Sequence, residues 1–297
     1  MLLRYCASFL LLLSLTASAW VAGAADAPPK LKVLIVDGQN NHDWKKTTPV
    51  MKKALESCGR FTVDVATSPP ARHDMSGFKP NFAAYDVVLS NYNGDPFSPQ
   101  TRQGLLDYVK NGGGFVVVHA ADNAFGDWKE FNEMIGLGGW GGRNEKSGPY
   151  VYFKDGKQVV DTSRGHGGGH GPQHPFQIIV RDTEHPITQG MPTSWMHDKD
   201  ELYTHLRGPA QNMKILATAL APKTLGGHDF DEPMLIVLDY GRGRVFHTPM
   251  GHADYSMKCS GFITSLQRGT EWAATGKVTL PIPEDFPKAN TPTSREW

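Results

Sequence analysis

The sequence predicts an α/β protein with a doubly wound, mainly parallel sheet in a single domain. Short apolar runs alternate with helical segments in the first half of the chain, and such runs are typical of strands buried on both faces. The predicted helices carry start and stop signals at their ends. No internal repeat or linker divides the 297 residues, and this length suits one large domain.

The first half of the chain alternates strands and helices in the order βαββαβα. We expect the strands at residues 31–36, 61–66, 85–90 and 115–118. Thr48 and Pro49 predict the start of the first helix, as N-cap and first helical residue, and Gly59 predicts its end. Ser98 and Pro99 repeat this start signal for a second helix. A short third helix is expected at residues 128–135, capped by Asp127.

The second half is less regular but completes the same domain. A glycine-rich segment at 136–171 contains Asp155 and Gly156, which are typical of a hairpin turn. Further apolar runs predict strands at 176–180, 214–220, 234–238 and 244–248, followed by a helix at 260–275 that Gly276 ends. The proline-rich residues 277–297 are expected to form an extended strap.

The N-terminus has the pattern of a secretory signal peptide at residues 1–24. Arg4 precedes an apolar run at 9–15, and small residues follow at 16–19 and 22–25, so that cleavage after Ala19 or Ala24 fits. The apolar run is too short to span a bilayer. We therefore expect an extracytoplasmic protein, periplasmic or secreted, with no membrane attachment after removal of the signal.

Charge and cysteine usage exclude several classes of function. Thirty basic residues balance thirty acidic ones without a block of like charge, which argues against nucleic acid or an anionic membrane as partner. Only Cys58 and Cys259 lie outside the predicted signal, so a disulfide framework or a thiolate metal site is not expected. The sequence leaves open whether these two pair, and it leaves the oligomeric state open.

Polar residues gather where four predicted strands end. Ligands of open α/β sheets bind beyond the carboxyl ends of the strands, and these segments lie at 37–44, 91–95, 119–123 and 251–254. We predict catalytic roles for His119, Asp122 and His252. The predicted substrate-binding residues are His42, Asp43, Trp44, Asp95 and Asn123. Each of the predicted catalytic residues has a structural alternative, as a core histidine or a helix cap.

Seven motifs together resemble the ThuA-like family, named for trehalose utilisation. They are GGGF at 112–115, HAAD at 119–122, HPIT at 185–188, DELY at 200–203, GRGRVF at 241–246, GH at 251–252 and EWA at 271–273. The resemblance covers residues 31–276. It implies the class I glutamine amidotransferase-like fold, which is flavodoxin-like, and a role in carbohydrate metabolism on oxidised (3-keto) sugars derived from disaccharides.

The chain lacks the nucleophile of amidotransferases. Residues 118–121 read Val-His-Ala-Ala, with no Cys, Ser or Thr at the bend where that fold carries its cysteine. Acid–base or metal-assisted chemistry is expected instead. Adjacent residues on a strand point to opposite faces, so only one of Asp200 and Glu201 enters the site. We predict Glu201 as general base and Asp200 as its structural neighbour.

The histidine-glycine segment at 165–174 is a candidate metal site. His170 and His174 are predicted to bind one divalent metal, zinc or similar, together with His119. A lid without metal and an inert loop remain alternatives. No nucleotide cofactor is expected.

Two classes of function stay open for a small-molecule sugar ligand. The first is a keto-sugar hydrolase, lyase or isomerase that moves protons next to the carbonyl, and the second is a carbohydrate-binding module without turnover. The many charged residues in the predicted site favour the enzyme. Among the aromatic candidates for stacking on a sugar ring, Trp44, Trp128, Trp140 and Tyr203, we favour Trp44.

Overall fold

The computed structural model describes residues 29–297. The predicted signal peptide at 1–24 lies outside these residues. Within them, no helix has both the length and the apolar character that a bilayer span requires. Cys58 and Cys259 are both free thiols.

The first half folds as the predicted alternation of strands and helices. Its elements are β1 Leu31–Asp37, α1 Trp44–Ser57, β2 Phe61–Thr67, β3 Val87–Ser90, α2 Pro99–Lys110, β4 Gly114–Val118 and α3 Lys129–Ile135, with 3₁₀ turns η1 Phe82–Ala84 and η2 His119–Asn123. The predicted cap of α2 is confirmed, because the Ser98 side chain accepts a hydrogen bond from the Thr101 N–H.

Two predicted helix starts were wrong. Helix α1 begins at Trp44, one turn before Thr48, and Pro49 lies inside it. A proline there removes only the hydrogen bond to the Lys45 carbonyl, and Lys45 is exposed, so water can replace that bond. Helix α3 has Trp128 rather than Asp127 at its N-cap.

The second half adds antiparallel strands to the sheet. Its elements are η3 Glu145–Ser147, β5 Tyr150–Lys154, β6 Lys157–Asp161, β7 Gly169–His170, β8 His174–Val180, β9 Ser194–Asp200, β10 Tyr203–Thr204, β11 Met213–Ala221, η4 Lys223–Leu225, β12 Phe230–Tyr240, β13 Gly243–Thr248, α4 Asp254–Met257 and α5 Ser260–Thr275. The predicted hairpin at Asp155 and Gly156 joins β5 to β6.

The main sheet combines a parallel half with an antiparallel half. Its order is β2-β1-β3-β4-β13-β12-β11-β8-β9, and the first five strands are parallel. Those five follow the flavodoxin-like order, which confirms the predicted fold class. The short strands β7 and β10 pair only with each other, in a separate two-stranded sheet.

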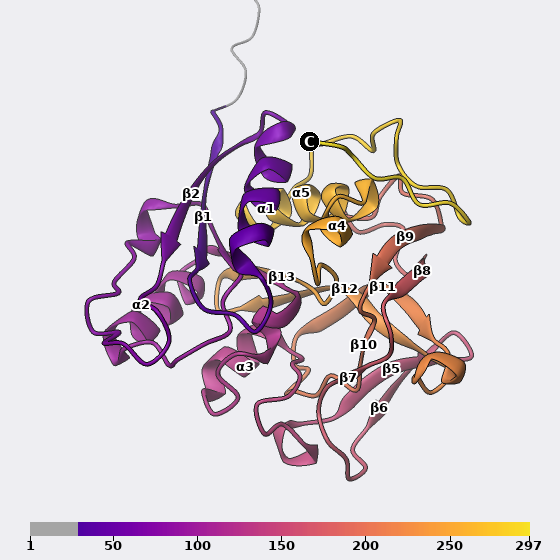
Figure 1. Cartoon of the computed structure of the whole chain (residues 1–297), viewed down its shortest axis with the longest axis horizontal. Coiled ribbons are helices and arrows are strands. Elements are labelled where there is room, and N and C mark those ends of the chain that lie inside the picture. The colour runs from indigo at the N-terminus through magenta and orange to yellow at the C-terminus, as the bar shows by residue number, and fades with distance from the viewer. Residues whose placement is uncertain (1–28) are drawn as a thin grey trace, which may run out of the picture.

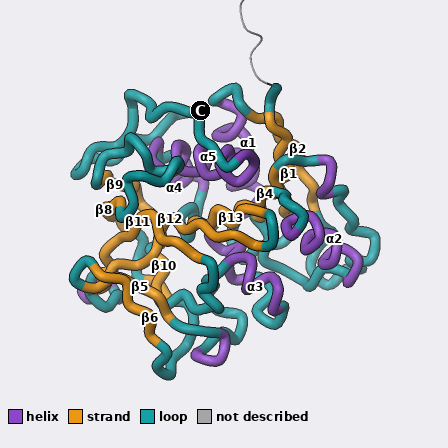
Figure 2. Tube along the Cα trace, turned by 180° about the vertical axis from the view of Figure 1, so that it is seen from behind, coloured by secondary structure: helices purple, strands orange, loops and turns teal. Residues whose placement is uncertain are grey.

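Helices cover both faces of the sheet. Helices α1, α4 and α5 lie on one face, and α2 and α3 lie on the other, as Figures 1 and 2 show from opposite sides. Each face has its own apolar core. Residues 277–297 contain no helix or named strand, and Leu280, Ile282 and Phe286 pack against the core beneath α5.

Helix α5 approaches the sheet closely through a glycine. A Cβ at Gly269 would overlap the ring of Phe246 on β13, which is fully buried. Gly104 on α2 offers a contrast, because a Cβ there would meet Phe82 at an ordinary 3.8 Å.

We therefore expect opposite effects from the same substitution at these two helical glycines. Gly269→Ala should lower the free energy of unfolding by about 1–3 kcal/mol, since overpacking outweighs the gain in helix propensity. Gly104→Ala should raise it by about 0.5–1 kcal/mol. Urea unfolding of both variants measures this. Equal effects would contradict the close packing of α5 on β13.

Candidate functional site

Four side chains from four different segments converge at one edge of the sheet. They are His42 after β1, His119 after β4, Glu201 after β9 and His252 after β13. Their nitrogen and carboxylate ligand atoms all lie within 4.8 Å of one another. Three imidazoles and one carboxylate are a donor set that could hold a divalent metal ion. We call these four residues the histidine-glutamate cluster.

The contacts within the cluster are short. Nε2 of His42 lies 3.0 Å from Nε2 of His119, and Nδ1 of His252 lies 3.0 Å from Oε2 of Glu201. Nε2 of His119 lies 3.7 Å from the same glutamate oxygen. Two imidazole nitrogens repel each other at this distance unless a proton or a cation lies between them.

His119 is oriented by the backbone. Its Nδ1 lies 2.7 Å from the Pro249 carbonyl oxygen, which can only accept, so Nδ1 carries a proton. The lone pair of Nε2 then faces the cluster, as in histidines that bind metals. His119 also has a left-handed backbone with φ of 48°. This strained conformation is rare for residues other than glycine and is often found at functional sites.

The cluster shifts the pKa values of its members in opposite directions. Burial and the neighbouring His119 and His252 lower the pKa of His42 to about 4, so its imidazole is neutral at pH 7. Burial acts to raise the pKa of Glu201, but the neighbouring His119 and His252 outweigh burial and lower the pKa. The hydrogen bond to Glu201 in turn raises the pKa of His252. Glu201 is therefore an anion among imidazoles.

The fully buried Asp200 fixes two of the four cluster residues. Its carboxylate accepts the backbone N–H groups of Glu201, Gly251 and His252 at 2.9, 2.7 and 2.9 Å. It also accepts a hydrogen bond from Nε2 of His197 at 2.7 Å. Burial disfavours an ionised Asp200, but the bond from His197 lowers its pKa. Asp200 thus holds the end of β9 against the loop after β13.

A polar cavity of about 320 Å³ opens over the cluster. It is lined by Asn41, His42, Asn93, Asn123, Trp140, Gly141, His170, Glu201 and Tyr203. Nε2 of His170 lies 3.8 Å from Oε2 of Glu201, and the Tyr203 hydroxyl lies 3.3 Å from Nε2 of His42. Amides and aromatic rings around a small cavity suit a small polar ligand.

Several predicted site residues lie elsewhere. Asp122 is fully buried and pairs with His247 at 3.2 Å, so it is part of the interior and does not contact His119. His174 begins β8 and lines a separate cavity beside Phe176, so the structure does not bring it together with His119 and His170 as the predicted metal set requires. His170 stays at the rim because β7 pairs with β10.

Three predicted substrate-binding residues lie next to the cavity rather than in it. Trp44 and Asp95 line an adjoining cavity, and Trp140 takes the place in the cavity wall that we expected for Trp44. Asp43 is exposed and pairs with Lys46 at 3.3 Å. Of the other two predicted substrate-binding residues, Asn123 lines the cavity, and His42 belongs to the cluster itself.

The sequence did not predict a role for His197 and His247, the buried partners of Asp200 and Asp122. Both sit inside strands, where a histidine carries no pattern that separates it from its neighbours. Asn41 and Asn93 lie in segments that the sequence did identify, at the ends of β1 and β3, but they were not singled out.

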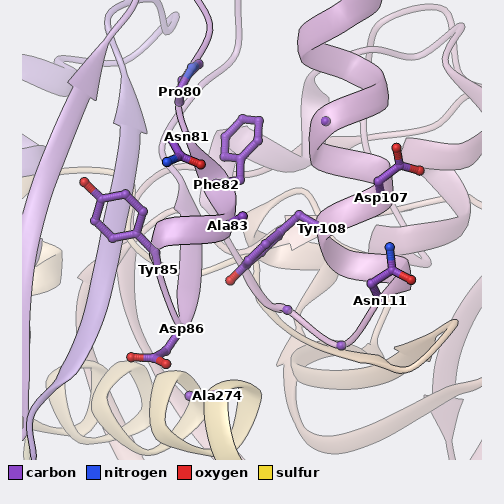
Figure 3. A pocket seen from close by; sticks show the side chains of 13 residues that line it. Pro80, Asn81, Phe82, Ala83, Tyr85, Asp86, Asp107, Tyr108, Asn111 and Ala274 are labelled. Carbon is purple, nitrogen blue, oxygen red and sulfur yellow. The ribbon is translucent and has the colours of Figure 1, made fainter.

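A larger cavity of about 580 Å³ lies at the opposite, amino-terminal ends of β3 and β4 (Figure 3). Three of its polar side chains already bond to the protein. The Tyr85 hydroxyl donates to Asp64, the Tyr108 hydroxyl donates to the Gly114 carbonyl, and Asp86 accepts the Lys32 N–H. None of the four cluster residues lines this cavity.

One family of known proteins matches most of the chain. The family model ThuA, described as trehalose utilisation, matches residues 32–273. Among proteins with curated descriptions, none matches the chain. A putative ThuA-like protein from Parabacteroides merdae ATCC 43184 is 49% identical, with a TM-score of 0.88 over 90% of this chain and 98% of that one.

A second solved structure shares the fold at lower identity. A putative ThuA-like protein from Bacteroides uniformis ATCC 8492 is 23% identical, with a TM-score of 0.57 over 88% of this chain and 97% of that one. The family match spans nearly all of β1 to α5 and includes the segments that carry the histidine-glutamate cluster. The chain therefore belongs to the ThuA family.

Proposed function

We propose that the protein is an exported carbohydrate-processing enzyme that acts on oxidised (3-keto) sugars or disaccharide derivatives with the help of one divalent metal ion, zinc or similar. The observation that carries this proposal is the histidine-glutamate cluster, with its ligand atoms within 4.8 Å, beneath a polar cavity. The family description, trehalose utilisation, supports the substrate class. The signal-peptide pattern of residues 1–24 supports export.

The donor set and its spacing support a metal ion. Zinc binds imidazole nitrogens at about 2.1 Å, so two ligands of a tetrahedral site lie about 3.4 Å apart. Nε2 of His42 and Nε2 of His119 lie 3.0 Å apart, close to that spacing. The low pKa of His42 and the anionic Glu201 supply the neutral imidazole and the negative charge that a cation requires.

A bound metal would polarise the ketone of the substrate as a Lewis acid. The residues around the cavity would do the remaining work. His170 lies at the rim, free to exchange a proton with the carbon next to the ketone, and histidine is the commonest acid–base group in enzymes. Burial raises the pKa of Tyr203 well above its usual value, so its hydroxyl stays protonated and can donate to a sugar oxygen. Asn41, Asn93 and Asn123 can orient hydroxyl groups.

The first test measures metal content. Glu201→Gln removes the only anionic ligand with little change in volume, and it should lower the affinity for zinc by at least about 100-fold. His174→Ala serves as control, because His174 lies outside the cluster, and it should bind as much metal as the wild type. Elemental analysis and a competition titration with a chelator decide this. Equal metal content in the wild type and in Glu201→Gln would show that the cluster is not the metal site.

The second test measures turnover. The metal-loaded protein should convert 3-keto-disaccharides, and removal of the metal with a chelator should abolish turnover until zinc or another divalent ion is restored. Product analysis separates hydrolysis, elimination and isomerisation. If the protein binds the sugar without any turnover in the metal-loaded state, it is a binding module rather than an enzyme.

A third test concerns the support beneath the cluster. Desolvation acts to lower the pKa of the buried His197, but Cys259 and Asp200 outweigh it and raise the pKa, so His197 is protonated. Asp200→Asn leaves that charge without its partner, and we expect a loss of about 3–5 kcal/mol in stability and about a 10–100-fold loss in metal affinity. Asp198→Asn, at a partly exposed aspartate on the same strand whose side chain accepts a hydrogen bond from the Ser294 hydroxyl, should change stability by no more than about 1 kcal/mol. Thermal unfolding and metal titration measure both effects. Unchanged metal affinity in a folded Asp200→Asn protein would show that Asp200 does not position the cluster.

A further inference from the structure

We propose that the cavity beside the ends of β1, β2 and β3 is a second sugar subsite, which binds the neighbouring unit of an uncharged, disaccharide-sized substrate. This inference rests on the proposed function, because the second subsite would continue the cavity that lies over the histidine-glutamate cluster. The second cavity has a volume of about 710 Å³, against about 320 Å³ for the first. We call it the switch-point cavity, since it lies where the flavodoxin-like strand order reverses, between β1 and β3.

The two cavities adjoin each other. Asn41 and Asn93 line both, and the Asn93 side-chain amide donates to Oδ1 of Asn41 at 2.7 Å. This hydrogen-bonded pair forms the boundary between them. A ligand held at the cluster can therefore extend past the pair into the switch-point cavity. A single sugar ring held at the cluster would leave that larger space unused.

The lining of the switch-point cavity suits a neutral polyhydroxyl ligand. It is lined by the indole of Trp44 and by Gln39, Asn40, Thr67 and Ser68, whose side chains are uncharged and are held in place by hydrogen bonds within the protein. Its charges are one lysine, Lys45, and one aspartate, Asp95. A sugar-binding site typically combines an aromatic surface with a few placed hydrogen-bonding groups. A phosphate or carboxylate ligand would instead call for an excess of basic side chains.

The walls of the cavity are preformed. Gln39 supports the loop after β3, because its side chain accepts the Asp95 N–H at 2.8 Å and donates to the Pro69 carbonyl at 2.8 Å. A Cβ at Gly94 would overlap the Gln39 side chain, and Gly38 has a φ of 112° against Ser68. Such close approaches leave little conformational freedom to the loops after β1, β2 and β3. A ligand that binds there therefore loses little free energy to the ordering of these loops.

Trp44 and Asp95 are the residues that would contact the second sugar unit. Trp44 is the first residue of α1 and is half-buried, so one face of its ring can pack against a sugar. Asp95 uses Oδ2 to accept the Arg72 N–H, while its Oδ1 makes no hydrogen bond within residues 29–297. That oxygen can accept from a sugar hydroxyl.

A competing location exists on the other side of His42. A cavity of about 350 Å³ is lined by Asp43, Lys46, Asp254 and Tyr255 as well as by His252. It also adjoins the cluster, through Asn41 and His42. Three of these side chains are charged, and the space is half that of the switch-point cavity. We therefore assign the second unit to the switch-point cavity and use Tyr255 as the control.

The test compares two substrates that share the oxidised unit, a 3-keto-glucosyl disaccharide and methyl 3-keto-glucoside. Binding of the second unit should give the wild type a higher kcat/KM for the disaccharide. Trp44→Ala should lower kcat/KM for the disaccharide about 10-fold more than for the methyl glucoside, and Trp44→Phe should restore most of it. Tyr255→Ala should leave the ratio of the two values unchanged. Equal losses on both substrates in Trp44→Ala, or a loss of the ratio in Tyr255→Ala, would overturn the assignment.

A binding measurement keeps this inference separate from the proposed function. The unoxidised disaccharide should show saturation-transfer signals with the metal-loaded wild type on both rings, and Asp95→Asn should lose them on one ring only. If the wild type turns over neither ketone, the proposed function fails, yet this pattern of signals would still establish the subsite. If signals arise from a single ring in the wild type, the subsite is refuted even when the ketones are turned over.

Discussion

One buried carboxylate joins the two segments on which the site depends. Asp200, at the end of β9, accepts hydrogen bonds from the backbone N–H of its neighbour Glu201 and from those of Gly251 and His252 in the loop after β13. An isolated charge in the interior is costly, and it persists only when hydrogen bonds and a counter-charge surround it. His197 provides that counter-charge. The antiparallel edge of the sheet and the last parallel strand are thereby fixed relative to each other. This fixes the positions of Glu201 and His252, which follow β9 and β13.

The remaining cluster residues come from the parallel half, where the chain geometry is simpler. His42 and His119 follow β1 and β4, and both strands end at the same edge because parallel strands share direction. His119 reaches the cluster only because its backbone adopts a left-handed conformation directly after β4. His119 thus occupies the bend directly after β4, and this bend brings its ring to the other three cluster residues.

The sequence predicted the parallel half of the fold because its strands are continuous apolar runs. It also predicted the edge at which His42, His119 and His252 meet, since that edge follows from strand direction alone. The sequence did not predict strand β9, because two of its buried residues are the polar His197 and Asp200. These two can be buried because they pair with each other, but they do not form an apolar pattern in the sequence. His174 and Asp122 were misplaced for a related reason. Contacts between distant segments, such as β7 with β10 and Asp122 with His247, decide where those side chains point.

The cover over the cluster is built differently from its floor. Tyr203 and His170 belong to the two-residue strands β7 and β10, which pair with each other and with no strand of the main sheet. The floor rests on long strands buried on both faces. Regions with few hydrogen bonds and few buried contacts open at a small fraction of the global unfolding free energy. Tyr203 is buried in the apolar core, whereas His170 is exposed, so His170 is the part of the cover that can exchange with solvent while Tyr203 and the cluster keep their positions.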